Sequence, residues 1–182
     1  MTQKKDIGKI VRDFGLAAVV LLIIIVMSFL SESFLTTNNI TNILRQISIN
    51  GVLAVGMTFV VLTGGIDLSV GSLVAVTSVI CGSLLEGEMN TFLVCIIGVA
   101  AAMAFGLLNG YLVSYVGFQP FIATLATMTI GRGFAMVYAD GKPYIIKDPS
   151  FIFIGQGKIA GIPTLVVILL IICMLGIIIL NT

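Results

Sequence analysis

The chain has 182 residues, of which 59% are hydrophobic and 9% are charged. A soluble globular domain usually carries about 25% charged residues, so there is too little charge here to cover a water-exposed surface. The net charge of +1 favours neither nucleic acid nor an acidic substrate as a partner. The sequence contains no histidine, which excludes histidine triads, histidine general bases and most zinc sites.

Uncharged stretches of the sequence have the lengths of membrane-spanning helices. Residues 14–31, 46–66 and 68–85 carry no charge, and each is close to the roughly 20 residues that cross a bilayer as a helix. The next uncharged run, residues 89–131, would be about twice as long as a hydrocarbon core is thick. We therefore expect it to fold back at Gly117–Pro120, where proline interrupts helical hydrogen bonding.

These runs predict an all-α membrane protein, a polytopic transmembrane helix bundle with about six spans in this chain. Residues 1–182 are expected to form a single transmembrane domain. The expected spans lie near residues 14–31, 46–63, 68–85, 91–115, 120–138 and 162–181.

The basic residues before the first span predict a cytoplasmic N-terminus by the positive-inside rule; they are Lys4, Lys5, Lys9 and Arg12. Six spans would then place residues 86–88 and the loop 139–162 outside. The lysines of that loop argue against this placement; they are Lys142, Lys147 and Lys158. A re-entrant segment within residues 89–131 would reverse the orientation of everything that follows.

Neither the cysteines nor the glycine-rich segments indicate catalysis. Cys81, Cys95 and Cys173 fall inside apolar runs and are interpreted as small core residues. A phosphate-binding loop is excluded at residues 136–143, because Met136 replaces its first glycine and Pro143 follows Gly141-Lys142. We therefore expect no catalytic residue, metal or cofactor, and any ATP that drives this protein must bind another subunit.

The segment from Thr63 to Gly71 predicts a break between two helices. Gly64 and Gly65 can end one helix, and Asp67 or Ser69 can accept hydrogen bonds from the first amides of the next. A carboxylate inside an apolar run needs a partner, a cavity or an interface. For Asp67 a helix N-cap is the commoner reading, a polar group lining a translocation path is the alternative, and the two are compatible.

Four further polar or small positions are candidates for a path or for packing. Asn109 and Gln119 lie near the ends of their spans and favour hydrogen bonds between helices. Thr124 belongs to a string of hydroxyls that suits either helix packing or the passage of a polyol. Arg132 either forms a buried pair, reaches the membrane interface, or faces a polar pathway.

Small residues recur at every fourth position of the fourth expected span, at Gly98, Ala102, Gly106 and Gly110. Such a stripe lets another helix approach closely. We therefore expect this face of the span to pack against a neighbour.

Five segments of the sequence form a set of motifs: Phe34–Ile40, Asn50–Thr58, Thr63–Ser72, Gln119–Leu125 continuing to Arg132-Gly133, and Gly141–Pro143. Taken together, these motifs resemble one family, the permease subunits of ribose-type monosaccharide ABC importers. The string Gly-Gly-Ile-Asp-Leu-Ser-Val-Gly at residues 64–71 is the most specific of them. Family members are longer and have more spans, so the resemblance identifies this chain as the N-terminal part of such a permease.

The resemblance implies a dimeric permease, with a second copy of the chain, in a bacterial inner membrane. An extracytoplasmic sugar-binding protein would deliver the solute, and cytoplasmic ATP-binding subunits would drive alternating access. Ribose is the favoured substrate.

Other functions stay open on the sequence alone. Branched-chain amino acids and nucleosides are the near alternatives as substrates. A truncated or structural membrane subunit with no transport of its own is a more distant one. A membrane-embedded enzyme would need a catalytic set beyond Asp67, Arg132 and scattered hydroxyls.

Overall fold

The computed structural model describes the backbone of residues 7–181 and the side chains of residues 14–181. Residues 1–46 and residues 47–182 form two compact units, which are described separately. Lys4 and Lys5 lie outside the described residues, and the side chains of Lys9 and Arg12 do too. The cytoplasmic N-terminus that rests on these four residues stays a prediction.

The first unit consists of helix α1 (Ile7–Leu30), a short connection and the start of helix α2 (Thr37–Leu62). The side chain of Thr36 caps α2, because its hydroxyl oxygen accepts a hydrogen bond from the Asn39 amide at 3.3 Å. The Asn39 side chain donates to the Phe34 carbonyl at 2.7 Å. From Phe14 onward α1 presents large apolar side chains at its surface, as expected of a helix that faces lipid or another protein.

The second unit continues with helices that match the apolar runs of the sequence. After α2 follow α3 (Val70–Glu86), α4 (Thr91–Ser114), α5 (Pro120–Tyr138), α6 (Pro149–Gln156), strands β1 (Lys158–Ile159) and β2 (Ile162–Pro163), and α7 (Thr164–Leu180). The chain folds back between α4 and α5, at the turn expected around Gly117 and Pro120.

This architecture confirms the predicted all-α polytopic membrane fold. Within the described residues α2, α4 and α5 are long and apolar enough to cross a bilayer. Shorter apolar helices cover residues 14–30, 70–86 and 164–180, and each would reach about 26 Å at 1.5 Å per residue. That all six cross the membrane stays a prediction.

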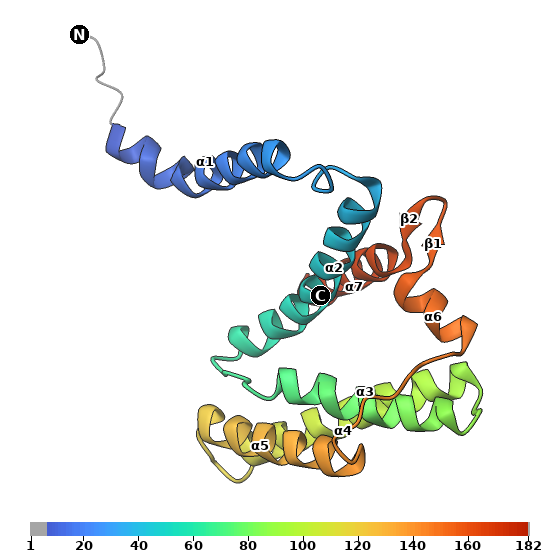
Figure 1. The fold of residues 1–182 in the computed structure, drawn as a ribbon. Helices are drawn as coiled ribbons and strands as arrows, with labels where there is room; N and C mark the ends of the chain where they lie inside the picture. Colours follow the sequence, from blue (N-terminus) through green and yellow to red (C-terminus); the bar gives the residue numbers. More distant parts are fainter. Residues whose placement is uncertain (1–6, 182) are drawn as a thin grey trace. The chain divides into compact units, whose positions relative to one another are not determined.

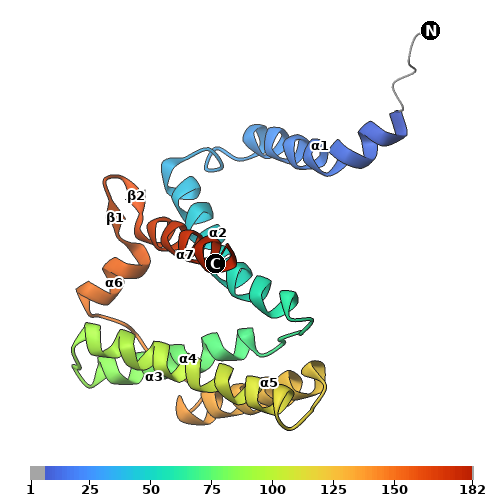
Figure 2. The ribbon, with the colours of Figure 1, turned by 180° about the vertical axis from the view of Figure 1, so that it is seen from behind.

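Helices α3, α4 and α5 pack against one another and lie side by side in both views (Figures 1 and 2). Small residues allow their close approach. A Cβ atom added to Gly131 of α5 would lie 3.1 Å from Ser72 Oγ of α3, and one added to Gly98 of α4 would lie 2.7 Å from Cys81 Sγ of α3. The three helices therefore depend on glycine at these contacts.

The buried residues of the described chain are mostly small and often polar. The buried hydrophobic residues are Val76, Val94, Ala123 and Ala135. Buried hydroxyls satisfy themselves locally: Ser72 Oγ donates to the Ser69 carbonyl at 2.7 Å, and Thr127 Oγ1 donates to the Ala123 carbonyl at 3.2 Å. Large apolar side chains lie mainly on the outside, which is the arrangement that a bilayer permits and water would not.

The ends of α3, α4 and α5 meet at two opposite places. Glu86 at the end of α3 and Glu88 just after it line one cleft, together with Tyr138 at the end of α5 and several of the residues that follow it. Residues 63–67 before α3 line a different cavity, together with Ser114 at the end of α4 and Pro120 at the start of α5. Successive helices therefore run in alternating directions.

Helix α7 touches α2 at two glycines. An added Cβ at Gly51 would lie 2.8 Å from Leu169, and one at Gly176 would lie 3.2 Å from Val55. Residue numbers rise together along both helices, so α2 and α7 run in the same direction where they meet.

The segment 139–162, expected to be a loop, contains structure that the sequence analysis did not anticipate. Tyr144 packs on α3 at Gly82, where an added Cβ would lie 2.6 Å from Tyr144 Cβ. Asp148 caps α6, since its Oδ1 accepts from the Phe151 amide at 2.7 Å, and it also accepts from Thr91 Oγ1 at 2.6 Å. Strands β1 and β2 then form a short antiparallel hairpin.

We expect Gly131→Val to weaken the packing of α5 on α3, because the added side chain would crowd Ser72 and Val76. Overpacking of this kind typically costs about 1–3 kcal/mol. Gly133→Val is the matched control on the same helix, since nothing lies within 4 Å of its added Cβ. The measurement is the free energy of unfolding in mixed micelles. Equal values for the two variants would contradict the close approach.

A second prediction concerns the pH dependence of α6. Hydrogen bonds from the Thr91 hydroxyl and from the Phe151 amide hold the pKa of Asp148 below its ordinary value. Such a carboxylate stabilises the fold above its ordinary pKa of about 4 and loses that contribution as pH falls through the lowered value. We therefore expect hydrogen-exchange protection of the Phe151 amide to fall in acid.

The same protection should already be low at neutral pH in Asp148→Asn and should no longer fall steeply in acid. Asp140→Asn is the control, because the Asp140 side chain is 87% exposed and pairs only with the exposed Lys142 among the described residues. Unchanged protection in Asp148→Asn would show that the carboxylate does not hold α6.

Candidate functional site

The break between α2 and α3 begins with the two glycines. Gly64 adopts a φ of 75°, a left-handed conformation that favours glycine. Its amide donates to the Val61 carbonyl at 2.9 Å, and the Gly65 amide donates to the Val60 carbonyl at 3.0 Å. These bonds satisfy the last carbonyls of α2, so the glycine pair ends the helix as the sequence predicted.

Asp67 has a different role from the expected N-cap. The N-cap of α3 is Ser69, whose own side chain makes no capping hydrogen bond. Asp67 Oδ1 accepts instead from the Ser69 amide at 2.7 Å and from the Ser69 hydroxyl at 2.6 Å. The N-cap prediction for Asp67 is therefore wrong: the carboxylate closes a local turn from Asp67 to Ser69, just before the helix begins.

Helix α4 holds the break by a hydrogen bond from Asn109, and Thr124 of α5 lies close to it. Asn109 Nδ2 of α4 donates to Ser69 Oγ at 2.9 Å, which is the bond between helices that the sequence favoured for Asn109. Thr124 Oγ1 of α5 donates to the Pro120 carbonyl at 2.7 Å and lies 3.3 Å from the Ile66 carbonyl. Ser69 and Asn109 are buried, so these bonds are shielded from solvent.

A cavity of about 290 Å³ opens beside the break, close to the lower end of the roughly 300–1,000 Å³ typical of ligand pockets. Its lining combines the end of α2, the break, α4 and the start of α5. Five of the predicted path residues line it: Gly64, Gly65, Asp67, Asn109 and Thr124. Their role in translocation stays a prediction.

The sequence analysis missed other residues of this lining, which are Val60, Thr63, Ile66, Val113, Ser114 and Pro120. The available signal was proximity in sequence, since all of them flank the glycine break or the turn before α5. Which of them faces the cavity depends on helix packing.

Three predicted path residues do not line the cavity. Ser69 is buried behind Asp67 and Asn109. Gln119 is the N-cap of α5 and is exposed, with no capping hydrogen bond from its side chain. Arg132 is exposed on α5, about 12 Å along the helix from Thr124, and makes no ion pair with another described residue.

The small-residue stripe of α4 divides between packing and the cavity. Gly98 packs against Cys81, and Ala102 is half-buried. Gly106 and Gly110 line the cavity, and nothing in the described chain lies within 4 Å of their added Cβ atoms. Close packing is therefore present at Gly98 and stays a prediction for the other positions.

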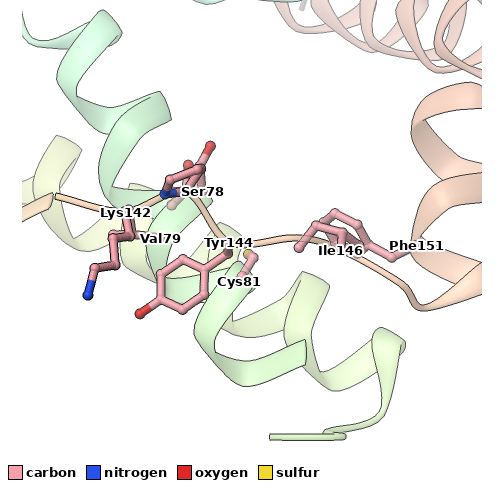
Figure 3. A pocket seen from close by; sticks show the side chains of 10 residues that line it. Ser78, Val79, Cys81, Lys142, Tyr144, Ile146 and Phe151 are labelled. Carbon is pink, nitrogen blue, oxygen red and sulfur yellow. The ribbon is translucent and has the colours of Figure 1, made fainter. Parts of the chain in front are cut away.

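A larger cavity of about 450 Å³ lies between α3 and residues 142–151 (Figure 3). Ile146 and Phe151 lie toward one end of it, and Lys142 and Tyr144 toward the other. Its lining includes none of the predicted path residues. One of its lining side chains, Cys81, donates weakly to the Val94 carbonyl of α4 at 3.8 Å. Because the predicted path residues gather at the helix break instead, we regard that cavity as the better candidate site.

Most groups that line the cavity are uncharged, both polar and apolar. Asp67 is the one charged residue that lines the cavity in the described chain. No group of three or more acidic, cysteine or histidine side chains that could hold a metal occurs among the described residues. Hydroxyl, amide and backbone groups therefore dominate any interaction with a solute.

We expect Ser69→Ala to destabilise the fold, because the buried Asn109 amide would lose its acceptor. A buried polar group left unsatisfied costs about 1–3 kcal/mol. Ser78→Ala is the control, since Ser78 is an exposed serine within α3, the helix that Ser69 precedes. The measurement is the free energy of unfolding of both variants in mixed micelles. Equal values would show that Ser69 does not stabilise the break.

Comparison with known proteins identifies the family. Residues 39–182 match the family model described as the permease component of the branched-chain amino acid transport system. The ribose import permease protein RbsC of Bacillus subtilis is 43% identical over 78% of this chain and 45% of that protein. The protein of the same name from Haemophilus influenzae is 40% identical over 89% of this chain and 51% of that protein.

A third relative is named for a different sugar. The D-allose transport system permease protein AlsC of Escherichia coli is 35% identical over 89% of this chain and 50% of that protein. The chain thus spans about half the length of the curated relatives it matches. No solved structure matches the chain significantly.

The relatives are named as permeases, and no enzyme family is indicated. Together with the apolar helices, they make the chain a multi-pass membrane protein of the bacterial inner membrane type. The match covers most of the chain and includes every residue of the cavity at the helix break. This chain therefore belongs to the permease-component family of the branched-chain amino acid transport system.

Proposed function

We propose that this chain forms part of the permease of an ABC importer that translocates a monosaccharide, with ribose the favoured substrate. The observation that carries the proposal is the sequence identity of this chain, over most of its length, to two ribose import permeases, at 43% and 40%. The D-allose relative supports the same substrate class.

In this proposal the cavity at the helix break forms one part of the solute path. A neutral sugar has only hydroxyl and ring oxygens to recognise, so it needs hydrogen-bonding groups rather than ions. Asn109 and Thr124 offer such groups, and Gly64 and Gly65 leave room beside them. Interrupted helices are tolerated inside a membrane where they line a cavity of this kind.

The charge of the cavity favours a sugar over an amino acid. An amino acid carries a carboxylate and an ammonium group, and both need partners when removed from water. In the described chain Asp67 could face the ammonium group, but no cationic side chain lines the cavity. Arg132 is exposed elsewhere on α5. A nucleoside is neutral and remains the second candidate.

The proposed orientation has a cytoplasmic N-terminus and six crossings. The alternating directions of α3, α4 and α5, together with the common direction of α2 and α7, suit this order. It puts the helix break toward the cytoplasm and residues 138–147 outside. Lysines outside are unusual, but Lys142 and Lys147 share their cleft with Glu86, Glu88 and Asp140, so the local charge is mixed.

Transport would require partners. A cytoplasmic ATP-binding subunit would supply the energy, an extracytoplasmic binding protein would deliver the sugar, and a second copy of the permease would complete the pathway. Binding and hydrolysis of ATP in the partner would shift the permease between outward-open and inward-open populations.

The test is ATP-dependent uptake of labelled ribose into vesicles that contain this chain with its ATP-binding and binding-protein partners. We expect uptake, competed by other monosaccharides but not by branched-chain amino acids. Thr124→Val should lower it several-fold, because it removes a hydroxyl from the cavity, whereas Thr129→Val should not, since Thr129 is exposed on the same helix.

Two other results would reject the proposal. Uptake of an amino acid in place of the sugar would reassign the substrate. Normal membrane insertion and partner binding without flux of any solute would instead support a structural subunit.

A further inference from the structure

One polar atom of the cavity lacks a partner in the described chain. Asn109 is 6% exposed, and its Oδ1 makes no hydrogen bond with any described residue. The residue lines the cavity at the helix break. Buried polar groups are nearly always satisfied, so an unpaired one beside a cavity calls for a water molecule or a ligand.

The orientation of the Asn109 amide follows from its neighbours. Ser69 Oγ lies 2.6 Å from Asp67 Oδ1, and an ionised carboxylate can only accept a hydrogen bond. The single hydroxyl proton of Ser69 is therefore donated to Asp67. Ser69 Oγ can then only accept, so Asn109 must turn its NH₂ group toward Ser69 at 2.9 Å.

This chain of hydrogen bonds leaves the carbonyl oxygen of Asn109 as the unpaired end of a side chain that lines the cavity, and in this conformation the oxygen itself has almost no accessible surface. An asparagine is otherwise free to present either end of its amide. Here the negative charge of Asp67, acting through Ser69, selects the acceptor end.

The two threonine side chains of the lining also present acceptors to the cavity. Thr124 Oγ1 donates its proton to the Pro120 carbonyl at 2.7 Å, and Thr63 Oγ1 donates to the Val60 carbonyl at 2.8 Å. Each hydroxyl keeps only lone pairs for a ligand. With Asp67 and Asn109, these threonines form a lining rich in acceptors.

We propose that Asn109 Oδ1 accepts a hydrogen bond from a hydroxyl group of a neutral solute in this cavity, and that Asp67 and Ser69 are positioning residues that fix the orientation of the amide. The cavity then selects ligands rich in donors, such as polyols and sugars. The inference rests on the proposed function for the identity of the solute. The hydrogen-bond polarity itself does not depend on transport.

The experiment measures binding in the isolated 182-residue chain, in lipid nanodiscs, by saturation-transfer NMR of ribose at millimolar concentration. The comparison ligand is a deoxyfluoro analogue of ribose, in which fluorine replaces a hydroxyl and so removes a donor at little change in size. We expect a ribose signal at least several-fold stronger than that of the analogue. Equal signals, or no ribose signal, would overturn the proposal.

Variants assign the effect to the named residues. Asn109→Leu should abolish the ribose signal, whereas Asn50→Leu should keep it, because Asn50 is an exposed asparagine of α2 outside the cavity. Ser69→Ala should reduce the preference for ribose over the analogue, since the Asn109 amide can then present either end. A uniform loss of both signals in Ser69→Ala would indicate a purely structural role and contradict the positioning.

This experiment separates the inference from the proposed function. Ribose binding that requires Asn109, in a chain that supports no uptake, would sustain the inference and reject transport by the assembly. Uptake without any binding at Asn109 would sustain transport and reject this cavity as the place where hydroxyls are recognised.

Discussion

The hydrogen-bond chain from Asn109 through Ser69 to Asp67 is the interaction on which the organisation of the helix break depends. It joins α4 to the connection between α2 and α3 through Ser69, which has no exposed surface. It also gives the carboxylate of Asp67 two donors, the amide and the hydroxyl of Ser69. A charge that would otherwise be expensive in an apolar environment thereby becomes part of a local turn.

Close packing of small residues makes this chain geometrically possible. Gly98 and Gly131 let α4 and α5 approach the two sides of α3, and that approach brings Asn109 and Thr124 within reach of the break. Helices in a bilayer gain little from burying large apolar side chains, because lipid is equally apolar. An interior of glycine, serine and threonine, with large apolar groups outside, is consistent with this balance.

The sequence was sufficient for features that depend on local composition. Uncharged runs located the long helices, and the pair Gly64-Gly65 located the break, because both signals lie within a few neighbouring residues. It was not sufficient for contacts between distant segments. The partnership of Ser69 with Asn109 joins residues 40 positions apart, and one sequence without packing information does not determine it.

Helix phase and short elements explain the remaining differences. Thr124, Thr127 and Gly131 share the buried face of α5, and Arg132 lies about 100° around the helix from Gly131, which leaves it exposed. The short helix α6 has a local signal in Asp148-Pro149, a cap followed by proline at the first turn. Eight residues within a polar loop were too few to stand out by hydrophobic periodicity.

We propose above that the cavity at the helix break is a water-accessible part of a solute path. The most direct measurement is labelling by a membrane-impermeant maleimide in sealed vesicles of both orientations, with Cys81, Cys95 and Cys173 replaced by alanine. Cysteine at Gly110, which lines the cavity, should react from one side, whereas cysteine at Val99, which is 61% exposed on α4 away from the cavity, should stay unlabelled in lipid. Absence of labelling at position 110 in both orientations, or equal labelling at the two positions, would contradict the claim.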